Sequence, residues 1–377
     1  MNREKDRNWD MGNKWEQIGT WFYVILFWAV CLIPSVGMLF FRSELAENRE
    51  LAGVPSFWTE DGGWNRDYFE ELQNYVSEHF AFRGELVSAD SLIKYQLLRT
   101  PCDDQVIIGR DEWLFFSETL ADYAGVTLPD DEIDRIAKRM LEVSEYVQAQ
   151  GKKPLFVIVP NKNSIYPEYM PARFGVRAEA RNLTMLQERM SSLDIPYVDA
   201  YQIFLAGKDT EELYLHEDTH WNNTGARLVL NEIYAAYGLD DQYTLTGYQI
   251  EESHRPDLYA ILFPEKEHFE AQHVYSDGKE YSYIGRMHSV DDMKIRTTAQ
   301  NGNGRSILVY RDSFGRALIP YMGGTFDSVT FNRSTPYDLS VVEKTDCDYV
   351  LFEIVERNLK DLGQISVEVK TSQANNS

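Results

Sequence analysis

The sequence predicts an α/β domain built on a parallel sheet, preceded by one transmembrane helix. Two observations carry this prediction. Residues 18–41 contain no charged side chain, and these 24 residues exceed the roughly 20 that are needed to cross a bilayer. From residue 130 onward, amphipathic helical segments alternate with short apolar runs, which is typical of a parallel sheet with crossover helices. The chain beyond residue 41 is long enough for one sizeable α/β domain with additional segments.

The apolar run near the N-terminus is expected to anchor the chain in the cell membrane. It is longer than the apolar part of a cleaved signal peptide, which has about 7–15 residues. It is also too long, and apolar on too many sides, for a helix that packs into a core. Residues 1–17 carry four basic side chains, which favours a cytoplasmic N-terminus. We therefore expect residues 1–17 to be a cytoplasmic tail, residues 18–41 to be a single-pass anchor, and the rest of the chain to be extracytoplasmic.

The remaining chain is expected to divide into a membrane-proximal part and a main domain. Between residues 65 and 99 apolar side chains recur at helical spacing, so residues 42–104 are expected to form a membrane-proximal helical region. The main domain is expected over residues 105–365, and it begins with a strand or hairpin around Gly109. Residues 366–377 are polar, and chain ends of this kind are generally frayed.

Within the main domain the pattern predicts alternating helices and strands. The expected helices span residues 130–150, 177–193, 223–237 and 314–322, and the expected strands span residues 154–159, 197–199, 306–310, 328–331 and 348–354. Residues 161–171 form a loop at the edge where open α/β sheets bind their ligands. Lys162, Asn163, Tyr166 and Tyr169 are therefore candidate pocket residues, although such side chains are equally common in ordinary loops.

Residues 240–304 interrupt this alternation. The segment is polar and rich in Tyr, His, Asp and Glu, and it has no strong helical periodicity. We expect an insertion with some β-structure, which would serve either as a substrate-shaping lid or as a plain surface elaboration.

Two motifs far apart in the sequence are predicted to form one active site. Residues 214–225 (Tyr-Leu-His-Glu-Asp-Thr-His-Trp-Asn-Asn-Thr-Gly) place Asp218 and His220 two positions apart, so both side chains leave the same face of an extended segment. Residues 309–315 (Val-Tyr-Arg-Asp-Ser-Phe-Gly) place Ser313 between an expected strand and an expected helix. The glycine that ends this motif permits a tight turn.

These three side chains have the chemistry of a catalytic triad. A serine hydroxyl is a weak nucleophile and needs an adjacent base, and the imidazole in turn needs a carboxylate that fixes its tautomer. We predict Ser313 as the nucleophile, His220 as the base and Asp218 as the group that orients it. Taken alone, Asp312 and Ser313 could simply cap a helix, and a lone histidine is usually an ordinary surface or core residue. The two motifs together favour catalysis.

A zinc site is the competing interpretation of the first motif. His216-Glu-Asp-Thr-His220 matches the H-E-x-x-H string of zinc metalloproteases, which works only on a helix because both histidines must share one face. Here Asn222-Asn-Thr-Gly225 predicts that the helix begins after His220. No third ligand is recognisable downstream, so we predict no metal and no cofactor.

The charge balance limits the partners that the chain can bind. Sixty acidic residues against 37 Lys and Arg give a net charge of −23, which disfavours nucleic acid, whose binding needs clustered basic residues. The same argument disfavours a strongly anionic polymer, although Arg311, Arg316, Arg333 and Arg357 could offset it locally. Of the cysteines, Cys102 and Cys347 are the pair that could form an extracytoplasmic disulfide, and the sequence does not decide whether they meet.

Several motifs, taken in order, resemble the DHHW family and the related alginate O-acetyltransferase-like proteins. The matching stretches are residues 47–52, 80–83, 108–115, 159–167, 218–222, 312–315 and 348–357. The resemblance implies an SGNH-hydrolase-like three-layer α/β/α fold with permuted order, and it gives the catalytic roles to Asp218, His220 and Ser313. The chain departs from the pattern at Arg311, where related serine motifs usually have glycine.

The resemblance also implies a function. It predicts a membrane-anchored O-acyltransferase, with an acetyl group as the expected acyl group, that modifies a cell-envelope or exported polysaccharide through an acyl-serine. Such proteins often work beside a multi-pass membrane protein that delivers the acyl group. Two alternatives stay open at this point: a carbohydrate esterase or deacetylase with the same triad, and a non-catalytic envelope protein that retains the fold.

Overall fold

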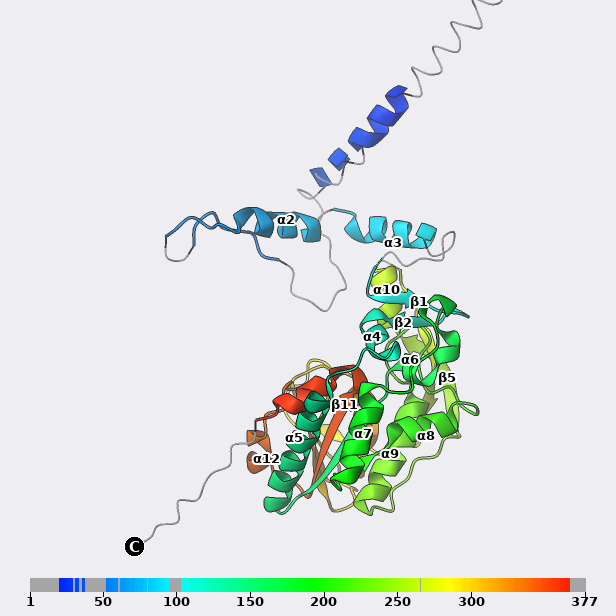
Figure 1. Cartoon of the computed structure of the whole chain (residues 1–377), viewed down its shortest axis with the longest axis vertical. Helices are drawn as coiled ribbons and strands as arrows, with labels where there is room; N and C mark the ends of the chain where they lie inside the picture. The colour runs from blue at the N-terminus through cyan, green and yellow to red at the C-terminus, as the bar shows by residue number, and fades with distance from the viewer. Residues whose placement is uncertain are drawn as a thin grey trace, which may run out of the picture. The chain divides into compact units, whose positions relative to one another are not determined.

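The computed structural model describes residues 20–29, 31–33, 36–37, 52–59, 62–79, 81–94, 103–264 and 266–366. The chain divides into two compact units (Figure 1). The first comprises Met1–Cys102 with Ala260–Glu267, and the second comprises Asp103–Tyr259 with His268–Ser377.

The predicted membrane anchor falls only partly on described residues. Residues 20–29, 31–33 and 36–37 are helical, whereas residues 18–19, 30, 34–35 and 38–41 lie outside the described part of the chain. Where the chain is described, no helix combines the length and the apolar character that a membrane span requires. The anchor therefore stays a prediction, as does the cytoplasmic tail over residues 1–17, which lies outside the described residues.

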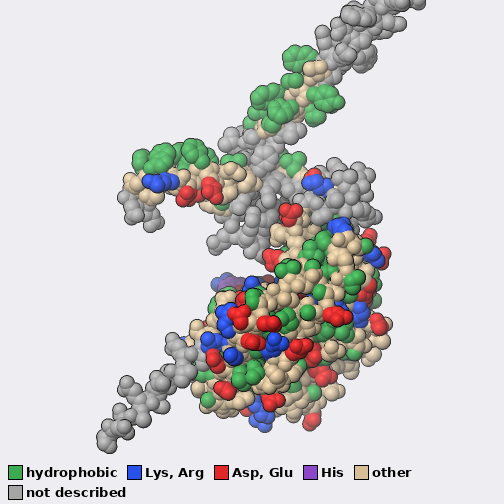
Figure 2. Space-filling view, viewed as in Figure 1, with side chains coloured by type: hydrophobic (Ala, Val, Ile, Leu, Met, Phe, Trp, Pro, Cys, Tyr) green, Lys and Arg blue, Asp and Glu red, His purple; other side chains and the backbone are tan. Residues whose placement is uncertain are grey.

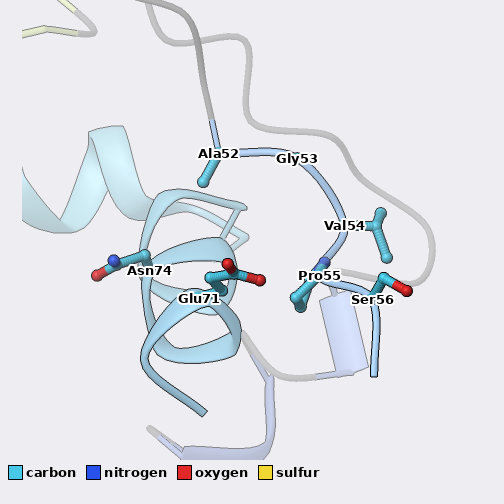
Figure 3. Close-up of a pocket in the computed structure, with 7 residues that line it drawn as sticks. All are labelled: Ala52, Gly53, Val54, Pro55, Ser56, Glu71 and Asn74. Atoms are coloured by element: carbon cyan, nitrogen blue, oxygen red, sulfur yellow. The ribbon is translucent and has the colours of Figure 1, made fainter. Parts of the chain in front are cut away.

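Helices α2 (Tyr68–His79) and α3 (Arg83–Ile93) lie in the first unit, as the helical spacing predicted. Aromatic side chains before and along α2 are exposed, and they form the hydrophobic area that Figure 2 shows there: Phe57, Trp58, Trp64 and Phe69. A pocket in this unit is lined by residues 52–56 together with Glu71 and Asn74 (Figure 3). No histidine is among these lining residues, so the pocket offers no serine–histidine pair.

The second unit is built on a seven-stranded sheet with the order β4-β3-β11-β9-β10-β8-β7. The strands are β3 (Lys153–Val159), β4 (Tyr197–Val198), β7 (Ser282–Tyr283), β8 (Lys294–Thr298), β9 (Ser306–Tyr310), β10 (Ser328–Asn332) and β11 (Tyr349–Val355). Strands β4, β3, β11, β9 and β10 are parallel. The sequence therefore predicted this parallel core of the sheet correctly. Its central strands are nearly continuous apolar runs, as expected where a sheet is buried on both faces.

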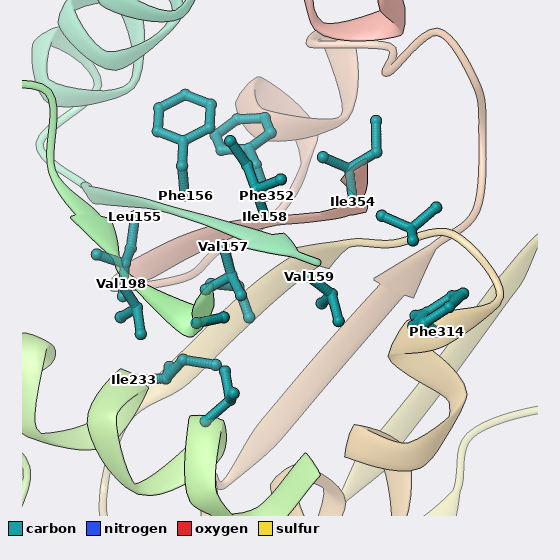
Figure 4. Close-up of a cluster of buried hydrophobic side chains, with 14 of the residues drawn as sticks. Leu155, Phe156, Val157, Ile158, Val159, Val198, Ile233, Phe314, Phe352 and Ile354 are labelled. Atoms are coloured by element: carbon teal, nitrogen blue, oxygen red, sulfur yellow. The ribbon is translucent and has the colours of Figure 1, made fainter. Parts of the chain in front are cut away.

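Helices cover both faces of this sheet. The main helices are α5 (Asp130–Ala149), α7 (Asn182–Ser192), α8 (Ala200–Gly207), α9 (Asn223–Tyr237) and α11 (Ile319–Thr325). Helices α5 and α7 pack together, α8 and α9 pack together, and both α5 and α8 contact β3. Figure 4 shows Phe156 and Phe352 on one side of the strands, and Val157 and Val159 on the other side with Ile233 of α9. Because successive side chains of a strand point to opposite faces, each face of the sheet presents apolar side chains to one layer of helices.

Two observed helices differ from the predicted ones, one in its starting residue and the other in being split into two segments. Helix α7 begins at Asn182 rather than residue 177, and the Thr184 hydroxyl accepts a hydrogen bond of 3.0 Å from the amide of the N-cap residue Arg181. The predicted helix 314–322 is split into the 3₁₀ helix η5 (Phe314–Leu318) and α11. Pro320 lies at the start of α11, where its missing N–H is tolerated.

The polar segment 240–304 is more structured than its sequence pattern indicated. It forms a two-stranded antiparallel hairpin of β5 (Tyr248–His254) and β6 (Glu270–Tyr275). It also contains the short helix α10 (Asp257–Leu262). Its strands β7 and β8 extend the main sheet in antiparallel orientation beyond β10. The expected β-structure is therefore present, and part of it belongs to the main sheet.

The hairpin expected around Gly109 is also present, as β1 (Val106–Ile108) paired antiparallel with β2 (Leu114–Phe116). A Cβ at Gly109 would lie 2.6 Å from the Tyr169 carbonyl oxygen, so glycine is required there by close backbone approach. Cys347 is buried and free, and Cys102 lies outside the described residues.

Candidate active site

The two predicted motifs meet beyond the carboxyl end of β9. Ser313 lies in the turn between β9 and η5, and residues 214–222 form an irregular segment in front of α9. Parallel strands bring their carboxyl ends to one edge of the sheet, which is where such folds place their ligands. Trp221 joins the two segments, because its Nε1 donates a hydrogen bond of 2.9 Å to the Phe314 carbonyl.

The structure brings Ser313, His220 and Asp218 into one chain of hydrogen bonds. His220 Nε2 lies 2.9 Å from Ser313 Oγ, and His220 Nδ1 lies 2.6 Å from Asp218 Oδ1. Asp218 and His220 are buried, whereas Ser313 is half-buried. This is the arrangement in which a serine hydroxyl can pass its proton to an imidazole that is oriented by a carboxylate.

The neighbours of the His220 ring fix its tautomer. Arg316 Nη2, which can only donate, lies 3.2 Å from Nε2. The Asp218 carboxylate, which can only accept when ionised, lies beside Nδ1. The proton therefore belongs on Nδ1, and the Nε2 lone pair faces Ser313. This is the tautomer that a general base needs.

Charges around the pair shift both pKa values in the sense that favours an ion pair. Burial, the largest influence, would raise the pKa of Asp218, but His220 and His254 outweigh it and hold this pKa well below its usual value. Burial would likewise lower the pKa of His220, but Asp218 and Asp257 together leave this pKa raised. Asp218 therefore stays ionised beside His220, and it stabilises the imidazolium that forms when His220 accepts a proton.

A buried lysine supports the loop that carries Asp218 and His220. Lys162 Nζ donates to the carbonyl oxygens of Leu215 (3.0 Å), His216 (2.8 Å) and Asp218 (2.6 Å). Burial, partly offset by nearby carboxylates, lowers the pKa of Lys162 to about 8. Lys162 was a candidate pocket residue, and the structure instead makes it a brace of the active-site loop.

The other candidate pocket residues of the 161–171 loop also make structural contacts. Asn163 donates to Thr119 Oγ1 at 2.8 Å, and the Tyr166 hydroxyl accepts from the Leu213 amide at 3.0 Å. The Tyr169 ring stacks on Trp113 with centroids 4.4 Å apart. These contacts hold the loop against the hairpin β1–β2 and the segment before Asp218.

The serine turn is shaped by the carboxylate of Asp312 and by one arginine. Asp312 accepts from the amides of Phe314 and Val355, each at 2.8 Å, and so ties the turn to the end of β11. Arg311, where related motifs have glycine, is fully buried and donates to the Asp312 carbonyl at 3.1 Å. A Cβ at Gly315 would lie 2.6 Å from Arg311 Cβ. Glycine at position 315 therefore leaves room for the larger side chain at position 311.

The zinc interpretation of residues 216–220 does not fit the structure. Helix α9 begins at Asn223, after its N-cap Asn222, so no helix carries both histidines. His216 stacks on Trp113 with centroids 4.4 Å apart, whereas His220 faces Asp218 and Ser313. Glu217, the base of a metalloprotease motif, contacts His268 instead. The predicted start of the helix after His220 is thus confirmed.

One group of side chains within the described residues has the spacing of metal ligands. Asp218, His220 and Asp257 each offer one ligand atom, and these atoms lie within 4.8 Å of one another. The same atoms also form the hydrogen-bond chain to Ser313. A cation bound there would need the Nδ1 lone pair of His220, which the tautomer described above does not provide.

The sequence did not point to the residues that the 240–304 segment brings to the site. His254 Nε2 lies 2.7 Å from Asp218 Oδ2, and Asp257 accepts from the Thr219 amide at 2.8 Å. Glu270 accepts from the amides of His216 and Glu217, and burial raises the pKa of this carboxyl group. The sequence feature that could have indicated these residues was the richness of the segment 240–304 in His, Asp and Glu.

Comparisons with known proteins show which families this chain is similar to. The family model for the SGNH hydrolase-like domain of the acetyltransferase AlgX matches residues 106–276. A protein named probable alginate O-acetylase AlgJ from Pseudomonas syringae pv. tomato is 27% identical over 214 residues, which cover 57% of this chain and 51% of that protein. AlgJ from Pseudomonas aeruginosa is 28% identical over 169 residues, which cover 42% of this chain and 41% of that protein. The chain thus spans about half the length of the curated relatives it matches, or less.

Among solved structures, Bacillus cereus PatB1 with a sulfonyl adduct aligns with a TM-score of 0.54 at 17% identity. The alignment covers 70% of this chain and 98% of that one, and at this identity it shows the fold alone. The resemblance to alginate O-acetyltransferase-like proteins predicted from the motifs is confirmed. The α/β unit of this chain therefore resembles an SGNH hydrolase-like domain in its fold.

Proposed function

We propose that this chain is a membrane-anchored, extracytoplasmic O-acetyltransferase that acts on a cell-envelope or exported polysaccharide. The observation that carries the proposal is the hydrogen-bond chain from Asp218 through His220 to Ser313. The names of the relatives, acetyltransferase and alginate O-acetylase, support the reaction class and the polysaccharide acceptor. The anchor over residues 18–41 would hold the domain beside a multi-pass membrane protein that supplies the acyl group.

The proposed reaction has two transfers. In the first, Ser313 Oγ attacks the carbonyl carbon of an acetyl donor, and His220 Nε2 takes the hydroxyl proton and gives it to the leaving oxygen of the donor. Ser313 then carries the acetyl group as an ester. In the second, a sugar hydroxyl attacks that ester while His220 takes its proton and returns it to Ser313 Oγ. Asp218 holds the ring and stays ionised throughout.

Cationic side chains near Ser313 suit a glycan that carries some negative charge. Arg316 lies beside His220, and the guanidinium groups of Arg316 and Arg333 share the carboxylate of Asp291. The Arg357 guanidinium lies 5.1 Å from the centre of the Phe314 ring. These guanidinium groups partly offset the net charge of −23 near the place where the acceptor would bind.

The proposal predicts acetyl transfer and not merely acetyl release. The full-length protein, incubated with an acetyl ester and a polysaccharide, should produce acetylated sugar faster than free acetate, because a bound sugar hydroxyl competes with water for the acyl-serine. Mass spectrometry of the glycan and an acetate assay measure the two products. If free acetate is the product whether or not glycan is present, the chain is an esterase of the same fold.

The triad predicts activity that does not depend on a metal ion. A chelator should leave acetyl-ester turnover unchanged, and Glu217→Gln should cost little, because Glu217 contacts His268 rather than the reacting groups. Under the zinc interpretation Glu217 is the base and its loss abolishes turnover. Activity that disappears with chelator and returns with added zinc would overturn the role given to His220.

A further inference from the structure

The hairpin β5–β6 and the turn that follows β5 reach the carboxylate of Asp218. His254 Nε2 lies 2.7 Å from Oδ2, and the Asp257 amide donates to the same oxygen at 2.9 Å. The other oxygen, Oδ1, accepts from the ring of His220 at 2.6 Å and from its amide at 2.8 Å. Both oxygens of Asp218 are thus held, and half of the donors come from this insertion.

The backbone of β5 is irregular where it delivers His254. The pairing register between β5 and β6 shifts between Glu252 and His254, and bulges of this kind re-aim a side chain relative to a regular strand. The residues of β5 before the bulge are exposed, whereas the His254 side chain is 24% exposed. The side chains of β5 before the bulge therefore face solvent, whereas the side chain after it contacts the active site.

A second contact from the same turn holds the next residue of the loop. Asp257 accepts from the Thr219 amide at 2.8 Å and from its hydroxyl at 2.6 Å. Asp257 Oδ2 also lies 3.5 Å from His220 Nδ1. The insertion thus contacts Asp218, Thr219 and His220 in succession, and these contacts support the loop that carries the catalytic residues.

We propose that His254 is a positioning residue of the active site, which acts through Asp218. This inference rests on the proposed function of the triad. An ionised carboxylate only accepts hydrogen bonds, so His254 Nε2 is the donor. Its bond to Oδ2 holds the carboxylate in the plane in which Oδ1 meets His220 Nδ1. The segment 240–304 is in this respect a structural part of the site rather than a lid over it.

The proposal predicts a specific change in the pH profile. Without the His254 donor, the Asp218 carboxylate becomes more basic and binds the imidazolium form of His220 more strongly. The pKa of His220 then rises. As the pH is lowered, the neutral base form of His220 is lost at a higher pH than in the wild type, so the acid limb of kcat/KM moves to higher pH. The polar groups that face the His220 ring are those of Asp218, Thr219, Asp257, Ser313 and Arg316. A substitution at position 254 replaces none of these residues, and among them it removes a hydrogen bond only from Asp218.

The test uses the full-length protein and turnover of an acetyl ester across pH. His254→Phe and His254→Leu remove the donor, His254→Gln keeps an amide donor at a similar reach, and Glu251→Gln is the control on the same exposed strand. The two donor-free variants should lose roughly 10- to 100-fold in kcat, the range for one hydrogen bond to a charged group. KM should change little, and the acid limb of kcat/KM should move to higher pH. His254→Gln should restore most of the lost kcat and most of the shift in the acid limb.

Ser313→Ala, measured in parallel, separates a failure of the positioning role of His254 from a failure of the proposed function. If Ser313→Ala is inactive while His254→Phe and His254→Leu match wild type in kcat and in acid limb, the positioning role is overturned and the proposed function stands. If His254→Gln is as impaired as the donor-free variants and all three lose thermal stability, His254 is only structural. Wild-type turnover by Ser313→Ala would overturn the proposed function itself.

Discussion

Ser313→Ala should abolish acetyl transfer, and His220→Ala should be about as severe. The first variant removes the atom that carries the acetyl group, and the second removes the base that lies 2.9 Å from it. Members of a triad act as a unit, so their losses do not add and each can reach roughly 10⁶-fold in kcat. Turnover of an acetyl ester, followed by single-turnover kinetics, measures both losses.

His216→Ala is the matched histidine control for this prediction. His216 lies on the same loop, but it stacks on Trp113 and has no contact with Ser313 or Asp218 among the hydrogen bonds of the described residues. Its loss should therefore be mild, provided that circular dichroism shows all three variants folded. Damage equal to that of His220→Ala in a folded protein would mean that the wrong histidine has been assigned.

Asp218→Asn should also be severe, but less so than Ser313→Ala and His220→Ala, with a loss of roughly 10³- to 10⁴-fold in kcat. The amide can still bond to the ring at position 220, but an NH₂ group facing Nδ1 favours the tautomer with its proton on Nε2. That tautomer cannot accept the proton of Ser313. The negative charge that stabilises the imidazolium is also lost, and with it the raised pKa of His220.

The pH profile separates this effect from misfolding. A residual activity of Asp218→Asn should show its acid limb at lower pH than wild type, because the pKa of the imidazole falls when its carboxylate partner is gone. Unfolding would instead reduce the amplitude without moving the limb. An Asp218→Asn protein with wild-type kcat would show that Asp218 braces the loop and has no part in the chemistry.

The sequence predicted the parallel core and the three candidate residues because local patterns specify them. The buried runs at 154–159 and 306–310 are apolar and bounded by polar residues, and α9 has a recognisable start at Asn222, whose side chain accepts from the Gly225 amide. The spacing of Asp218 and His220, and the position of Ser313 after a strand, are equally local features. Each could be recognised without knowledge of what lies opposite in the fold.

The remaining parts depend on contacts that no local pattern reveals. Strand β7 has two residues and β8 has five, and their place in the main sheet depends on pairing with β10 rather than on their own composition. His254 is significant only because Asp218 lies 2.7 Å away. Lys162 was expected as a candidate pocket residue in a loop, and its ammonium group is instead buried, where it donates to three carbonyl oxygens.

Covalent labelling of Ser313 tests the central claim most directly. A fluorophosphonate reacts with a serine only when a neighbouring base activates the hydroxyl, so the folded wild-type protein should be labelled at the peptide that contains Ser313. His220→Ala should prevent that labelling while circular dichroism shows an intact fold. A folded protein that is not labelled, beside a hydrolase control that is, would contradict a catalytic Ser313 and favour a non-catalytic envelope protein.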